Sequence, residues 1–279
     1  MQNRFPKWIR DYADDMREKE RSEATIEKYT HAVEMFSDWL GQKTLCKDRV
    51  IEWKNNLCSS GYSPITVNTF LSAVNGLFRL IGKTDCCVSF LKVQRRVFRD
   101  PDIELNRNEY EKLVLAAQAH GDRRGALLME TICSTGIRVS EVAYITVEAA
   151  RRDRTVIKMK GKVRTILLPR KLSKLLLAYA KEQNITSGPI FRNRHGKSMT
   201  RRQIWEEMKK ICAMTKIDAR KVFPHNLRHL FARMYYKAHT DIVRLADLLG
   251  HSSIETTRIY LMTSGEEHQK QLETLGLLI

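Results

Sequence analysis

The sequence predicts a mainly α-helical protein with one small antiparallel β-hairpin, arranged as two domains. Three observations predict this fold class. Apolar residues recur at helical spacing in several segments, two short β-branched stretches flank a lysine–glycine turn near position 160, and a basic break in periodicity follows residue 92. We therefore expect domains over 1–93 and 104–279, joined by a basic linker over 94–103. At 279 residues, the chain is long enough for each domain to bury its own core.

The first domain is expected to be a small helical bundle. A helix is predicted over 25–40, where apolar residues recur at three- and four-residue steps. A second helix begins after Ser63, a good N-cap residue, with Pro64 at its first helical position. Shorter apolar stretches over 8–16 and 50–57 predict two further helices.

The second domain is expected to combine helices with the hairpin. Helices are predicted over 108–119, 125–133 and 139–145, the last following a turn at Thr135-Gly136. Because Arg138 lies at that turn, Glu141 is spaced to orient a neighbouring basic group. An exposed glutamate in a first helical turn is the plainer interpretation.

The predicted hairpin carries several lysines. Its strands cover 155–159 and 163–168, and the Lys160-Gly161-Lys162 step between them is typical of a tight turn. A lysine at a hairpin tip can reach into a neighbouring groove. Lys158, Lys160 and Lys162 alternate with period two, so spacing does not choose among them.

Charge indicates a polyanionic partner. The formal net charge is +17, from 49 basic and 32 acidic side chains. Residues 1–98 have a net charge of +4 and residues 99–279 a net charge of +13, so the second domain is expected to hold much of a phosphate-binding surface. Nucleic acid is the leading candidate, and a merely solvated basic exterior is the alternative.

The cysteines and the amino terminus predict a cytoplasmic protein. The six cysteines include no C-x-x-C pair and no zinc-ligand spacing, so they are expected to be reduced thiols. No segment has the roughly 18 consecutive apolar residues of a membrane span, and residues 1–10 lack the apolar core of a signal peptide. We expect neither secretion nor a membrane partner.

One predicted helix, over 224–238, carries three chemically useful side chains. His225, Arg228 and His229 stand at i, i+3 and i+4, which places them on one helix face. A zinc site is a weak interpretation, since arginine does not ligate metals and no further ligand lies nearby in sequence. A phosphate clamp fits better, because a guanidinium fork matches two phosphate oxygens and imidazole adds a donor.

The chain continues with a histidine and a tyrosine nine residues later. Ser252 and Glu255 have the spacing of a capping box, which predicts a helix starting directly after His251. Tyr260 is then expected about two turns into that helix. A nucleophilic phenol is one interpretation, and an ordinary half-buried tyrosine is the other.

Taken together, these motifs resemble those of the tyrosine recombinase (phage integrase) family, in the right order over residues 100–265. They are Thr135-Gly136-Ile137-Arg138-Val139-Ser140-Glu141, the lysine hairpin, His225-Asn226-Leu227-Arg228-His229, and Leu249-Gly250-His251 with Tyr260. The first domain is similar in kind to that family's helical, SAM-like core-binding domain. The resemblance implies a two-domain clamp around duplex DNA, with the second domain catalytic. Since no arm-binding domain precedes the bundle, it also implies action at paired inverted-repeat core sites.

The resemblance assigns a role to each matching residue. It makes Tyr260 the nucleophile, Arg138 and Arg228 the pair that holds the scissile phosphate, and Lys160 the acid that protonates the leaving 5′ oxygen. It makes His225 and His251 supporting donors. Glu141 and His229 complete the site as supporting residues, while the proton of Tyr260 passes to His225 or to a neighbouring base.

The expected reaction needs no cofactor. A phosphotyrosine ester is similar in energy to the bond broken, so rejoining needs no ATP, and the sequence has neither a phosphate-binding G-x-x-x-x-G-K-[ST] loop nor an acidic metal-binding cluster. By family analogy we expect a homotetramer on two duplexes. The tail over 266–279 ends in apolar residues and is expected to dock on the next protomer or on its own domain.

Two other functions stay open from sequence. A type IB topoisomerase-like enzyme shares this chemistry but relaxes supercoils without exchanging partners. A DNA-binding regulator that no longer cuts is the alternative from a different class. The sequence does not choose among integration and excision, inversion, and dimer resolution, and it does not identify the DNA site.

Overall fold

The computed structural model describes residues 5–93, 101–159, 162–260, 269 and 272–275. The chain divides into two compact units, Met1–Arg95 and Arg96–Ile279, each with its own core. The residues predicted as linker lie mostly outside the described ranges, as do residues 160–161 and most of the tail. The described part is mostly helical and includes a two-stranded antiparallel sheet, so the predicted fold class is confirmed.

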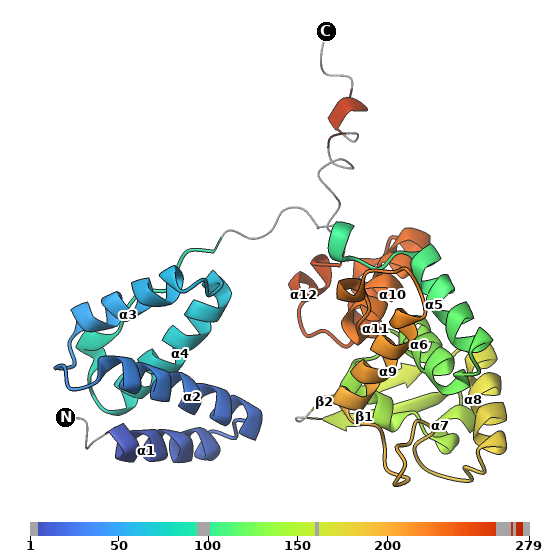
Figure 1. Cartoon of the computed structure of the whole chain (residues 1–279), viewed down its shortest axis with the longest axis horizontal. Helices are drawn as coiled ribbons and strands as arrows, with labels where there is room; N and C mark the ends of the chain where they lie inside the picture. The colour runs from blue at the N-terminus through green and yellow to red at the C-terminus, as the bar shows by residue number, and fades with distance from the viewer. Residues whose placement is uncertain (1–4, 94–100, 160–161, 261–268, 270–271, 276–279) are drawn as a thin grey trace. The chain divides into compact units, whose positions relative to one another are not determined.

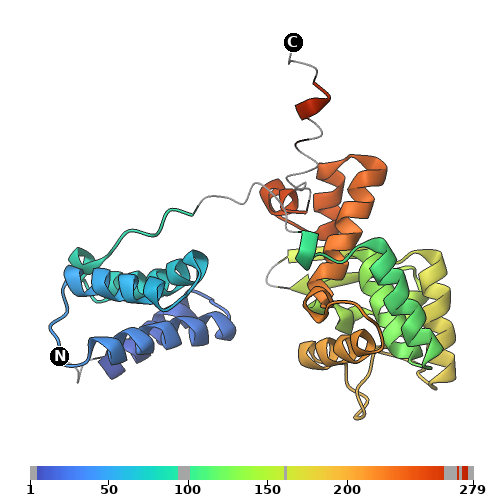
Figure 2. The ribbon, with the colours of Figure 1, turned by 45° about the horizontal axis from the view of Figure 1, so that its top comes forward.

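The first unit is a bundle of helices. Its elements are α1 (Phe5–Glu18), α2 (Glu23–Leu40), α3 (Lys47–Ser59), α4 (Pro64–Leu80) and the short 3-10 helix η2 (Thr84–Cys86). α2 packs against α1, α3 and α4 (Figures 1 and 2). Each helix expected in this region is present, and the Ser63 side chain caps α4 by accepting from the Thr66 amide as predicted.

Aromatic residues form the centre of this bundle. Phe36 is fully buried and makes edge-on contacts with Trp53 and Phe78, at centroid distances of 5.1 and 5.8 Å. Burying each ring stabilises the fold by roughly 1.5–3 kcal/mol, and the edge-on geometry adds about 0.5–1.5 kcal/mol. Because these rings come from α2, α3 and α4, they fix the helices against one another.

Two asparagines of α4 hold the segment that leaves the bundle. The amide of Asn75 donates to the Val88 carbonyl and accepts from the Val88 amide, at 2.9 and 3.1 Å. Asn68 makes the same pair of bonds with Leu91, at 2.9 and 2.8 Å. Each asparagine side chain satisfies the backbone N–H and C=O of one residue, as a paired strand would. The segment that follows the bundle is therefore fixed to α4 as far as Leu91.

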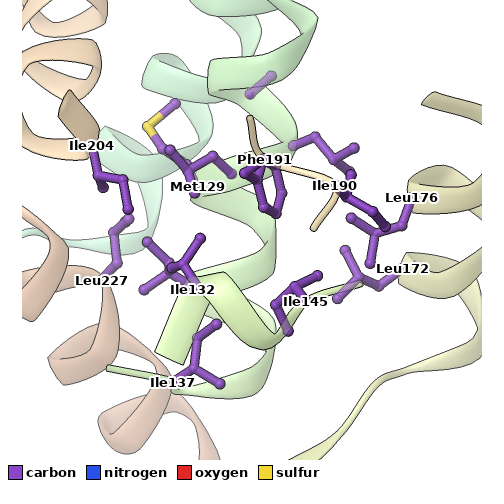
Figure 3. Packing of buried hydrophobic residues seen from close by; sticks show 14 of the residues in the cluster. Met129, Ile132, Ile137, Ile145, Leu172, Leu176, Ile190, Phe191, Ile204 and Leu227 are labelled. Atoms are coloured by element: carbon purple, nitrogen blue, oxygen red, sulfur yellow. The ribbon is translucent and has the colours of Figure 1, made fainter. Parts of the chain in front are cut away.

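The second unit is built around α6. Its elements are η3 (Pro101–Ile103), α5 (Arg107–Ala119), α6 (Arg123–Thr135), η4 (Val139–Tyr144), α7 (Val147–Arg151), β1 (Arg154–Met159), β2 (Lys162–Leu167), α8 (Arg170–Glu182), α9 (Arg201–Ala213), η5 (Ala219–Lys221), α10 (Pro224–His239), α11 (Ile242–Leu249) and α12 (Ile254–Arg258). α6 packs against α5, α8, α9 and α10. Figure 3 shows side chains from these elements converging, with Met129 and Ile132 of α6 close to Phe191 and Leu227.

The hairpin lies where it was predicted, but each strand begins one residue earlier than expected, and Lys162, expected in the turn, belongs to β2. β1 and β2 pair antiparallel from Arg154 opposite Leu167 to Met159 opposite Lys162, so residues 160 and 161 connect the strands. One strand face is buried through Ile157 and Ile166. The hairpin is therefore attached to the core of the second unit.

Two local predictions need correction. Residues Val139–Tyr144 form a 3-10 helix, where an ordinary helix over 139–145 was expected; six residues give an α-helix few i to i−4 bonds, and the tighter turn is common in such short pieces. The capping box at Ser252 was also wrong. Ser253 caps α12, which spans only Ile254–Arg258, so Tyr260 lies just beyond the helix. Two adjacent serines are equally good caps, and the sequence could not separate them.

Candidate active site

The predicted site residues that lie within the described part of the second unit converge around Arg228 of α10. This side chain is 2% exposed, and its guanidinium donates to the carbonyls of Gly136 and Leu249. It also donates to Nε2 of His251 at 2.8 Å. Burial lowers the pKa of Arg228, and a hydrogen bond with Tyr260 opposes that shift. Arg228 thus links α10 to the ends of α6 and α11 and to the candidate nucleophile.

The bonds of His251 define its protonation. A guanidinium only donates, so Nε2 accepts the bond from Arg228 and the ring proton is on Nδ1. Nδ1 then donates to the Thr257 hydroxyl at 2.8 Å. Burial, followed by the nearby arginines, lowers the pKa of His251 to about 4, so the ring is neutral at pH 7.

Tyr260 lies in a box of imidazoles. Its ring stacks on His251 at a centroid distance of 5.7 Å and meets His229 edge-on at 4.4 Å. His225 lies at 6.1 Å on a third side. The side chain is 3% exposed. The plainer expectation of an ordinary half-buried tyrosine does not describe this environment, because charged and titratable groups surround the ring.

Two of the three histidines of α10 lie at the site, and they differ in exposure. His225 is exposed, whereas His229 is partly buried and its Nδ1 has no hydrogen-bond partner within the described residues. Partial loss of solvent around the ring lowers the pKa of both, that of His229 to about 3, and neighbouring titratable and charged groups add to the shift. Their rings meet edge-on at 4.5 Å. No group of three potential metal ligands occurs among the residues that the structure describes.

Arg138 is the second cationic group of the site, and Glu141 holds it in place. The carboxylate accepts from the Arg138 guanidinium at 3.0 Å and from its backbone amide at 2.8 Å. Arg138 also donates to the Gly250 carbonyl at 3.3 Å. The Glu141 side chain is 4% exposed and that of Arg138 is 42% exposed. The glutamate is therefore a buried counterion, contrary to the exposed alternative, and Arg138 faces outward.

Sequence reasoning missed one residue here, Arg164 of β2. Its guanidinium binds both oxygens of Glu141, at 2.9 and 2.8 Å. A signal was present in the strand pattern. Position 164 shares the inward face with Ile166, so a charged residue at that step requires a buried partner.

The predicted general acid, Lys160, lies outside the described residues. In sequence it lies between β1 and β2. Arg164 of β2 belongs to the site because it binds Glu141. The role of Lys160 stays a prediction.

Comparisons with known proteins agree over both units. Residues 104–267 match the phage integrase family, and residues 9–82 match its N-terminal SAM-like domain. The tyrosine recombinase XerA of Thermococcus kodakarensis is 27% identical over 269 residues, covering 92% of this chain and 91% of the relative. XerD of Vibrio cholerae is 26% identical, covering 91% and 90%.

Solved structures share the fold. XerH bound to its difH substrate superposes with a TM-score of 0.68 at 22% identity, covering 91% of this chain and 80% of the other. A λ integrase dimer bound to a COC′ core site gives 0.73 at 16% identity, covering 91% and 76%. None of the described helices is long and apolar enough to cross a membrane. The chain belongs to the phage integrase family, the tyrosine recombinases, which cleave and rejoin DNA.

Proposed function

We propose that this chain is a site-specific recombinase that cleaves and rejoins duplex DNA through a 3′-phosphotyrosine intermediate. The position of Tyr260 carries the proposal: the side chain is buried, it interacts with the buried Arg228 and raises that group's pKa against the effect of burial, and histidine rings pack on it. A phosphate bound by that guanidinium would lie beside the phenol. The relatives named as tyrosine recombinases, and the DNA complexes of XerH and λ integrase, support the same reaction.

The proposed step balances without ATP or metal. The Tyr260 oxygen attacks phosphorus, and the bond from phosphorus to the 5′ oxygen breaks. The leaving oxygen takes a proton from Lys160 and becomes a 5′ hydroxyl. Such general acid catalysis speeds the step by roughly 10²–10⁴-fold. Attack by a 5′ hydroxyl of another strand reverses the step and restores the tyrosine.

Charge develops on the phosphate during attack, and two guanidiniums oppose it. Arg138 and Arg228 are held by carbonyl and carboxylate partners before DNA binds, so both guanidiniums are already gathered at the site. Mutating either arginine is expected to slow cleavage more than binding.

The histidines have different tasks in this proposal. His225 is neutral and exposed, so one nitrogen can donate to the phosphate while the other accepts the phenolic proton. Nε2 of His251 accepts from Arg228 and has no proton to donate. For His251 to support the phosphate as a donor, Arg228 must turn toward DNA and the imidazole must exchange its tautomer or gain a proton.

We propose that the working assembly is a homotetramer on paired inverted-repeat core sites, in the cytoplasm with the nucleoid. A solved λ integrase tetramer on a Holliday junction supports this assembly. The leucine- and isoleucine-rich end of the chain, over 275–279, suits an apolar contact with the next protomer.

The first experiment traps the covalent intermediate. Purified protein is mixed with nicked, labelled duplexes tiled across the flanks of its own gene, and a denaturing gel compares wild type with Tyr260→Phe. We expect a protease-sensitive, slow-migrating band for wild type only, with DNA binding retained by the variant. The phenylalanine keeps the ring contacts and removes only the oxygen.

Other outcomes point elsewhere. An adduct with Tyr260→Phe would make Tyr144, Tyr179 or another residue the nucleophile. DNA binding without any adduct would favour a regulator. Relaxation of plasmids that lack the site would favour a topoisomerase-like activity.

The general acid has a separate test. Lys160→Ala is expected to lose cleavage of ordinary DNA and to recover it on DNA with a 5′-bridging sulfur, because a thiolate leaves without a proton. Lys162→Ala is the matched control from the same hairpin. Rescue of Lys162→Ala in place of Lys160→Ala would move the assignment.

A further inference from the structure

The carboxy-terminal end of α11 binds three arginines. Each of three consecutive carbonyls accepts from a different guanidinium: Leu248, Leu249 and Gly250 accept from Arg164, Arg228 and Arg138, in that order. The last carbonyls of a helix have no partner within it and form the negative end of its dipole, which favours cations there. One helix end therefore fixes side chains from β2, α10 and the turn after α6, directly before His251.

Arg164 differs from the other two arginines. Its side chain is 12% exposed, against 42% for Arg138, and its Nε is buried with no partner within the described part of the chain. Its guanidinium donates to the Glu141 carboxylate and to the Leu248 carbonyl. This guanidinium is thus used inside the protein, one layer behind the surface that would meet DNA.

Gly250, the residue before His251, leaves room for the Arg164 side chain. Gly250 has a φ of +64°, and a Cβ added there would lie 2.4 Å from Cδ of Arg164 and 2.7 Å from its Nε. Such distances are far below a van der Waals contact. The glycine before His251 is required both by the left-handed turn and by the arginine packed on it.

The charges at Glu141 explain what this arrangement does. One nearly buried carboxylate is shared by two guanidiniums. If Arg138 were its only cationic partner, the carboxylate would offset most of the positive charge that Arg138 offers to a phosphate and would draw the side chain inward. Arg164 neutralises the carboxylate from behind, so Glu141 can orient Arg138 without cancelling its charge.

We propose that Arg164 is a positioning residue for the cleavage reaction, acting through Glu141 on Arg138 and through Leu248 and Gly250 on the turn that carries His251. This inference rests on the proposed function. Because Arg164 also belongs to β2, it ties the hairpin that precedes the phosphate-binding helices to the same arginine pair.

The test compares cleavage of charged and neutral phosphates. We expect Arg164→Met to slow single-turnover adduct formation at saturating DNA by roughly 10–100-fold, with DNA affinity changed less than about threefold. On a methylphosphonate at the scissile position, which lacks the charge that Arg138 opposes, the loss is expected to shrink severalfold. Adding Glu141→Gln to Arg164→Met is expected to restore part of the rate, because the unpaired carboxylate is removed.

Arg124 provides a matched control in the same unit. It makes a two-bond ion pair with Glu207, both at 2.8 Å, between α6 and α9. Arg124→Met should lower the melting temperature without any difference between phosphate and methylphosphonate. Arg164→Lys, which keeps the charge and loses the fork, is measured alongside in case Arg164→Met does not fold, and it should show the cleavage defect in a folded protein.

Three results would overturn the proposal. They are equal losses for Arg164→Met on the two substrates, a double variant no faster than the single one, and wild-type cleavage by Arg164→Lys when Arg164→Met does not fold. Failure of the wild-type protein to form any adduct would count against the proposed recombinase function itself. An active wild type with a silent Arg164 substitution would count only against this inference.

Discussion

At the scale of single residues, the site keeps its imidazoles neutral by burial. The pKa of His251 is lowered to about 4 and that of His229 to about 3, in both cases first by loss of solvent and then by nearby cationic groups. A neutral His251 can accept from Arg228, which a protonated ring cannot do. The phosphate-binding charge at pH 7 therefore comes from the arginines.

These shifts predict acid sensitivity. The unfolded chain binds protons at these histidines near pH 6.5, well above their pKa in the folded state, so their contribution to stability is complete above pH 6.5 and is lost as pH falls toward about 4 and 3. We expect His229→Phe, which keeps an aromatic ring beside Tyr260, to flatten the fall in melting temperature between pH 6.5 and 4. Circular dichroism melts at several pH values measure this.

The control for that experiment is His195→Phe, at an exposed histidine of a loop outside the cluster. Its melting temperature should follow the wild-type pH profile. If His229→Phe keeps the wild-type slope, protonation at His229 does not limit acid stability.

At the scale of elements, helix ends build the site. The C-terminal ends of α6 and α11 meet on Arg228 through the carbonyls of Gly136 and Leu249. Gly136 and Gly250 both end their helices in the left-handed conformation, with φ of +63° and +64°. Carbonyls that a helix cannot satisfy internally thus become fixed acceptors for arginines.

Gly250 gives an element-scale prediction. Gly250→Ala combines left-handed strain with a clash against Arg164, so we expect a loss of roughly 2–4 kcal/mol in the free energy of unfolding, together with slower cleavage. Gly121→Ala is the matched control: its φ is +73° but nothing lies within 4 Å of the added carbon, and only about 1–2 kcal/mol is expected. Urea denaturation compares the two, and equal losses would mean that the arginine moves aside.

At the scale of the whole molecule, charge and division into units dominate. The chain has a net charge of +17, and both compact units have a basic excess in sequence. All six cysteines are free thiols, so neither unit is stabilised by a disulfide bond. Each unit depends on its own hydrophobic core for stability.

The charge predicts steep salt dependence of DNA binding. If the protein neutralises six or more phosphates, its affinity for a duplex should fall on the order of 10³-fold between 50 and 200 mM salt. Fluorescence anisotropy titrations measure the slope. A methylphosphonate duplex of the same sequence is the uncharged control and should bind weakly with little salt response. A shallow slope on ordinary DNA would show that most of the basic surface faces elsewhere.

Much of this protein was determined by its sequence at short range. Apolar periodicity predicted α2 and α4, the lysine–glycine step predicted the hairpin, and the motifs around Arg138, Arg228 and Tyr260 predicted the family. Helix stripes, caps and tight turns depend on residues a few positions apart, which is why these features could be predicted from the chain itself.

Tertiary structure decided the rest. The partnership of Arg164 with Glu141, the burial of that glutamate, the proton position on His251 and the histidine box around Tyr260 all join residues separated along the chain. Desolvation and hydrogen bonding depend on what surrounds a group in space, and no local pattern specifies those neighbours. The sequence therefore supplied the chemical groups, and the packing of α10 on α6 and α11 set their charges and geometry.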